Sequence, residues 1–156
     1  MLLLSLPLLS FSQNFKKEDL IGTWGIVQSE FYLDEKLVRK VYVNEKTNDT
    51  VIEGPRTGND DEKFDQFAKM FQNSNLYFGK NEFFSWDIQD ETFRLTDKYW
   101  TFIPLTNTIS VSEWKDKGME NGKLVEFVVF SLENDKMVLD VNDSGMELKL
   151  HVVRKK

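Results

Sequence analysis

The feature that most constrains this fold is a series of short alternating segments separated by turn-forming residues. The segments follow one another at intervals of about 8–12 residues. Turn signals such as Asn121-Gly122 and Asn134-Asp135-Lys136 stand between them. The candidate strands are 21–33, 37–43, 50–52, 76–78, 83–88, 91–95, 98–105, 108–114, 123–132, 137–141 and 146–154. This spacing predicts an all-β, antiparallel sandwich or barrel.

Composition narrows the class of protein. The 156 residues fit one domain, and 13 Phe, 4 Trp and 4 Tyr supply enough apolar area for a packed core. A net charge of -6 argues against nucleic acid as a partner, because phosphate binding needs clustered Lys and Arg. The absence of cysteine from the sequence excludes disulfides, zinc–cysteine sites and thiol catalysis.

Residues 1–12 read as a secretory signal peptide. They are apolar and uncharged, and Ser10-Phe11-Ser12 is a small-x-small cleavage site. The stretch is shorter than the roughly 20 residues that cross a bilayer as a helix. We therefore expect an exported protein, periplasmic or secreted, whose mature chain (13–156) is a single β-barrel domain with no transmembrane segment.

One helix is expected among the early strands, at about residues 60–72. Asn59 or Asp60 would cap it, and the acidic residues that follow suit a helix N-terminus. Phe64, Phe67, Ala68 and Phe71 fall on one helical stripe. We expect this stripe to pack over a sheet or to plug a barrel end.

The start of the first strand resembles a known family. Leu20-Ile21-Gly22-Thr23-Trp24, together with an arginine on the last strand, is similar to bacterial lipocalin-like proteins of the calycin superfamily. The resemblance implies an antiparallel up-and-down, eight-stranded barrel that is closed at one end near the tryptophan. It also implies a cavity for a small apolar ligand. Lipocalins usually carry their helix before the final strand, whereas the helix expected here is inserted between early strands.

Strand parity gives this resemblance a physical basis. Met146, Leu148, Leu150 and Val152 share one face of the last strand with Arg154. If the first and last strands pair, Arg154 reaches the ring of Trp24 and forms a cation–π contact. We therefore predict that Gly22, Trp24 and Arg154 close the barrel.

Parity also suggests which residues would face a ligand. The ligand-binding candidates are Gln28, Glu30, Tyr32, Tyr77, Trp86 and Trp100. They combine aromatic and polar side chains on strands that should be half-buried, which is typical of a ligand pocket. Glu30 shares parity with Trp24 and would face inward, where a carboxylate needs a polar partner. A twist of the strand would instead place Glu30 at the rim.

The sequence gives little support for catalysis or for metal binding. His151 is the one histidine, and no Gly-x-Ser-x-Gly motif accompanies it. Asp140-x-Asn142-x-Ser144-Gly145 imitates a calcium loop, but His151 stands where the bidentate glutamate belongs. We expect no catalytic residue, no metal and no cofactor, so the protein is not expected to be an enzyme.

Two functions remain open. The first is binding of a small hydrophobic or amphipathic molecule in a barrel cavity. The alternative is a barrel filled by its own aromatic residues, which would act as a protein-interaction or inhibitor module of the cell envelope. An enclosed cavity would favour the first function, and an exposed apolar patch would favour the second.

Overall fold

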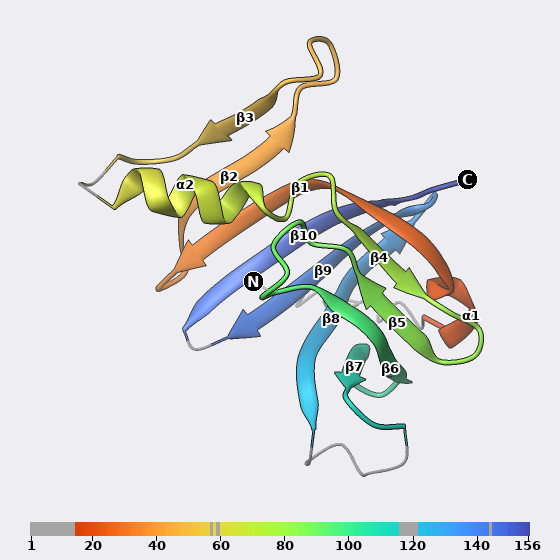
Figure 1. The fold of residues 1–156 in the computed structure, drawn as a ribbon. Coiled ribbons are helices and arrows are strands. Elements are labelled where there is room, and N and C mark those ends of the chain that lie inside the picture. Colours follow the sequence, from red (N-terminus) through yellow and green to blue (C-terminus); the bar gives the residue numbers. More distant parts are fainter. Residues whose placement is uncertain (1–14, 57, 59, 116–121, 144) are drawn as a thin grey trace, which may run out of the picture.

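The computed structural model describes residues 15–56, 58, 60–115, 122–143 and 145–156. The expected signal peptide lies outside these ranges. The described chain is mostly strand, with two short helices (Figure 1). The strands are β1 (Gly22–Leu33), β2 (Lys36–Val43), β3 (Thr50–Glu53), β4 (Asn75–Phe78), β5 (Phe83–Trp86), β6 (Leu95–Ile103), β7 (Thr108–Ser112), β8 (Lys123–Glu133), β9 (Lys136–Asp143) and β10 (Met146–Arg154). The helices are α1 (Lys17–Leu20) and α2 (Asp61–Lys69).

Eight strands form a closed antiparallel barrel. Strands β4 to β10 pair in sequence order, β4 pairs with β1, and β10 pairs with β1 to complete the ring. The expected eight-stranded, all-β barrel with a short helix inserted between early strands is therefore confirmed. Closure leaves no free edge within the barrel itself.

Strand β1 belongs to two parts of the fold. Its first residues, Gly22–Gly25, pair with β4, whereas Gln28–Leu33 pair with β2. Strands β2 and β3 thus leave the barrel as a hairpin, and α2 lies along this hairpin (Figure 1). We call β2, β3 and α2 the arm.

The expected phenylalanine stripe lies on α2 and just beyond it, and it packs against the barrel. Ala68 and Phe71 are buried. The ring centroid of Phe31 on β1 lies 5.5, 6.0 and 5.8 Å from those of Phe64, Phe67 and Phe71. Neither described helix is long and apolar enough to cross a membrane.

One of the eleven expected strands is wrong. Residues 91–93 form a turn, and β6 begins only at Leu95. Asp90 stabilises the turn, because its Oδ1 accepts a hydrogen bond from the backbone N–H of Thr92 at 2.8 Å and its carbonyl accepts one from Phe93. An aspartate that bonds the backbone two residues ahead is a recognised turn-former.

A β-bulge in β1 changes which side chains face the core. The register between β1 and β10 shifts between Ile26 and Gln28. Before the shift Trp24 and Ile26 are buried, and after it Ser29 and Phe31 are buried. An extra residue in one strand reverses the alternation beyond it.

Because of this bulge, three candidate ligand residues face the side opposite to the expected one. Gln28, Glu30 and Tyr32 alternate with the buried residues and pair with polar residues of β10. They therefore lie on the outer face of the barrel, not in its lumen. The expectation carried the parity of Trp24 through the bulge unchanged.

Candidate binding surface

Arg154 and Trp24 join the last strand to the first. The Arg154 Cζ lies 4.2 Å from the Trp24 ring centroid. Its Nη1 donates to the carbonyl of Ile21 at 2.5 Å and its Nη2 to that of Asp19 at 2.7 Å. Its Nε donates to Asp135 Oδ1 at 2.8 Å. These contacts fix the end of β10 to the chain that enters β1.

Gly22 allows this close approach. Its φ of +137° is disfavoured for residues with a side chain, and a Cβ there would lie 2.8 Å from Arg154 Nη1. The Trp24 indole is also satisfied, since its Nε1 donates to the carbonyl of Leu20 at 2.8 Å. The structure thus brings the three expected closure residues together.

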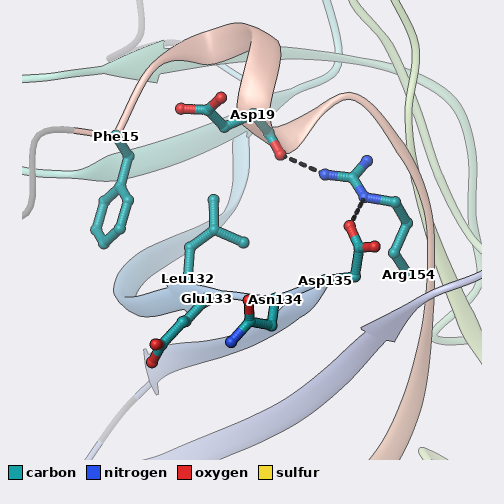
Figure 2. A pocket seen from close by; sticks show the side chains of 7 residues that line it. All are labelled: Phe15, Asp19, Leu132, Glu133, Asn134, Asp135 and Arg154. Carbon is teal, nitrogen blue, oxygen red and sulfur yellow. Dashed lines mark hydrogen bonds and ion pairs between the residues drawn. The ribbon is translucent and has the colours of Figure 1, made fainter.

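A hollow of about 430 Å³ opens beside Arg154 at this closed end (Figure 2). Its lining residues are Phe15, Asp19, Leu132, Glu133, Asn134, Asp135 and Arg154. All three guanidinium nitrogens of Arg154 already donate to protein oxygens. We therefore assign the hollow to barrel closure rather than to a ligand.

The lumen holds the protein's own aromatic side chains. Of the candidate ligand residues, Trp86 and Trp100 are only 5% and 2% exposed. Their indole nitrogens donate to Ser74 Oγ at 3.1 Å and to the carbonyl of Gly79 at 3.0 Å. Ring contacts with centroids 5.2–6.0 Å apart run from Phe71 through Trp86, Phe127, Phe84 and Phe78 to Trp100. These two tryptophans are packing residues of the core.

The six candidate ligand residues thus lie in three places. Trp86 and Trp100 are in the core, and Tyr77 lies on β4 with 44% of its surface exposed. The other three lie together on the outer face of β1.

Glu30 is the centre of this outer group. Gln28 Nε2 donates to Glu30 Oε1 at 2.6 Å, and the Tyr32 hydroxyl donates to Oε2 at 2.7 Å. His151 Nε2 from β10 lies 3.4 Å from Oε1. The carboxylate that would have been costly in the lumen therefore accepts two hydrogen bonds on the outer face.

These contacts fix the charges of the group. Burial alone would raise the pKa of Glu30, but the Tyr32 hydrogen bond, His151 and Gln28 lower it below its ordinary value. Burial and the same hydrogen bond raise the pKa of Tyr32 to about 12. At neutral pH the group is an ionised carboxylate that accepts from a protonated phenol.

A row of alternating charges crosses the outer face through Glu30. Five paired residues on β9, β10, β1, β2 and β3 form it: Asp140, Lys149, Glu30, Lys40 and Glu53. We call this row the charge ladder. Opposite charges on neighbouring strands stabilise a sheet by about 0.2–1 kcal/mol per pair. The register thus aligns opposite charges from the barrel strands to the arm, while Lys149 forms its ion pair with Glu147 on its own strand.

Exposed aromatic surface lies beside the ladder. Lys149 Nζ lies 5.2 Å from the ring centroid of Tyr32 and 5.5 Å from that of Phe130. Phe130 is 67% exposed and Val128, which pairs with Asp140, is 42% exposed. Aromatic side chains are enriched in protein interfaces, and a cation over their rings adds an attractive contact.

Asp140 is the least satisfied member of the ladder. Its Oδ1 is buried and has no hydrogen-bond partner within the described chain. Burial raises its pKa, against the opposing effect of Lys149.

A second hollow adjoins the Glu30 group. It measures about 770 Å³ and lies between β1, the end of β2 and the turn that follows. Gln28, Tyr42, Asn44, Asn48 and His151 give it polar walls. Val27 and Val43 add apolar lining, so the hollow offers both polar and apolar surface.

Sequence reasoning missed a buried arginine that holds the arm together. Arg39 on β2 is 3% exposed. Its Nε donates to Asp65 Oδ1 at 2.8 Å, and it also pairs with Asp61. Arg56 Nη1 adds a bond to Asp65 Oδ2 at 2.6 Å. The partners are 22 and 26 residues from Arg39 in sequence, so no local pattern marks them.

The described part of the chain contains no candidate metal site. There, no group of three or more His, Asp or Glu side chains could hold an ion. Within the calcium-like stretch, Ser144 lies outside the described residues, and Asp143 pairs with Met146 between β9 and β10. The outer face instead presents charged groups, hydrogen-bonding groups and aromatic area, which are groups that can contact a binding partner.

Comparison with known proteins gives no family for this chain. No family model, no curated protein and no solved structure matches it.

Proposed function

We propose that this is an exported, lipocalin-like protein of the calycin type that binds a protein partner through its outer face. It would act as an interaction or inhibitor module of the cell envelope, in the periplasm or secreted, and not as an enzyme. The observation that carries the proposal is the unbroken aromatic packing from Phe71 to Trp100 inside the barrel. A small apolar ligand would have to displace these rings.

The outer face carries aromatic side chains of the kind that anchor protein interfaces. Phe130 and Tyr32 flank Lys149, and the carboxylates of Glu30 and Asp140 lie in the same row as this lysine. Aromatic anchors surrounded by polar groups are where binding energy concentrates. The outer face of β8, β9, β10 and β1 is therefore the proposed contact surface.

Site-specific photo-crosslinking in the protein's own host tests this function. A benzophenone amino acid would replace Phe130 on the outer face of β8. The same replacement of Tyr77 on β4 is the matched control, because Tyr77 is also an exposed aromatic residue. We expect a discrete protein adduct at position 130 and none at position 77. No protein adduct at position 130, or the same adducts at both positions, would contradict the proposal.

A further inference from the structure

The arm ends in a free strand edge. β3 pairs with β2 on one side and is the last strand in the order of the sheet. Within the described ranges no strand pairs with its other side, and Figure 1 shows β3 at the outer margin of the arm. Its outward N–H and C=O groups are therefore available to an added strand.

Of the features that usually block edge pairing, β3 has only its short length and one charged residue. Thr50, Val51 and Ile52 are β-branched, and the strand contains no lysine, proline or bulge. Lysine, proline and bulges are the usual means of blocking edge pairing. Glu53 is the one charged residue of the strand.

Glu53 is also the last member of the charge ladder. Signs alternate along the row, and Lys40 precedes Glu53. Glu53 is exposed and accepts a hydrogen bond from the Tyr42 hydroxyl at 2.9 Å. A residue on an added strand opposite Glu53 would continue the alternation if it were basic.

The other face of β3 favours a different type of residue on an added strand. Ile52 pairs with the buried Val41 and packs against the core, on the side of the arm that carries Arg39 and the helix. A residue opposite Ile52 would lie next to this apolar surface. An apolar side chain there would bury area that is now exposed.

We propose that the free edge of β3 binds an extended segment of a partner protein by antiparallel strand addition. The segment carries Lys or Arg opposite Glu53 and an apolar residue opposite Ile52. This inference rests on the proposed function, because it specifies how a protein partner is held.

A second copy of this chain is a poorer occupant. β3 contains no basic residue to place opposite Glu53. Two copies with a charge of -6 each also repel one another. The charge pattern therefore favours a basic partner over self-association.

The test uses two synthetic β-hairpin peptides, each with an Asn-Gly turn. The exposed strand of one reads Lys-Ile-Thr-Val, so that its lysine falls opposite Glu53, and the other has glutamate in place of lysine. Each is titrated into the isotope-labelled protein while backbone amide shifts are followed by NMR. The Glu53→Lys variant is titrated in the same way, after its spectrum confirms that β10 is unchanged.

The wild-type protein should bind the lysine peptide roughly three- to tenfold more tightly than the glutamate peptide. Glu53→Lys should reverse this preference, and shifts should centre on residues 50–53. Equal binding of both peptides, binding elsewhere, or no binding would overturn the inference. A dimer that sedimentation detects and that Val51→Lys abolishes would overturn it in favour of a second copy. Crosslinking at position 130 does not depend on β3, so the proposed function can survive this failure.

Discussion

The guanidinium of Arg154 lies over the ring of Trp24 and donates to two carbonyls of the chain that leads into β1. The Arg154 side chain thus stacks on a residue of the first strand and donates hydrogen bonds to carbonyl oxygens that precede this strand. The barrel is closed by hydrogen bonds along the strands and by this contact at their end.

Removing either partner should destabilise the barrel before it affects binding. Trp24 is fully buried, so Trp24→Ala should lower the free energy of unfolding by about 3–5 kcal/mol. Arg154→Ala should cost about 0.5–2 kcal/mol from the lost cation–π contact, with a further loss from the hydrogen bonds. Chemical denaturation measures both. Lys63→Ala, which alters an exposed side chain on α2, is the control, and a Trp24→Ala midpoint equal to that of this control would contradict the closure argument.

The arm should depend on the Arg39 ion pairs. Arg39→Ala leaves Asp61 and Asp65 without their buried cation, and breaking such a pair costs about 3–5 kcal/mol. Arg39→Met should be milder because it also fills the space. Denaturation curves followed by amide exchange of α2 would show the difference. Equal stability of the alanine variant and the wild type would disprove this role.

Asp65 gives the same network a pH dependence. Burial alone would raise the pKa of Asp65, but hydrogen bonds from Arg39 and Arg56 lower it below its ordinary value. A lowered folded-state pKa means that the stabilisation is complete above the unfolded pKa of about 3.9. It is lost as the pH falls through the folded value. Asp65→Asn should therefore be less stable than wild type at pH 7, and this gap should narrow below about pH 4.

Strand parity predicted part of this fold well and part of it poorly, for one physical reason. The last strand alternates without interruption, so parity placed Leu148, Leu150 and Arg154 on the correct face. The first strand contains a bulge that no residue type announces, and parity failed for Glu30 beyond it. The Arg39 ion pairs could not be predicted, because the partners of Arg39 are remote in sequence.

The charge ladder was equally hidden from sequence reasoning. Each of its members lies on a different strand, and only the register brings them into one row. The register of β1 is itself shifted by the bulge. The charge ladder therefore cannot be predicted from the positions of the charged residues until the strand pairing is known.

Tyr32 should titrate later than an ordinary tyrosine. Its pKa is raised from 10.0 to about 12 by burial and by the hydrogen bond to Glu30. Because the folded-state value is raised, its stabilisation is complete below the unfolded pKa and is lost as the pH rises through about 12. The difference in tyrosinate absorbance between wild type and Tyr32→Phe isolates this group. Glu30→Gln should move its titration toward lower pH, and a Tyr32 midpoint at 10.0 in wild type would contradict the hydrogen bond.

Two phenylalanines on one strand separate the lumen from the outer face. Phe127 is fully buried and touches Trp86, whereas Phe130 is 67% exposed. Phe127→Ala should cost about 3–5 kcal/mol and leave a cavity. Phe130→Ala should stay within about 0.5 kcal/mol of wild type. An apolar fluorescent probe such as N-phenylnaphthylamine should bind saturably to Phe127→Ala and not to wild type or Phe130→Ala. Saturable binding to wild type would show that the lumen has room for a ligand.

Native mass spectrometry of the protein purified from its own host compares the two functions most directly. Because aromatic rings pack against one another from Phe71 to Trp100 inside the barrel, and because the outer face is proposed to bind a partner, we predict masses of the mature chain alone and of its complex with a second protein. The photo-crosslinked adduct at position 130 should contain that same second protein. A stoichiometric adduct of small-molecule mass, with no protein complex, would contradict the proposal and restore the barrel cavity as the binding site.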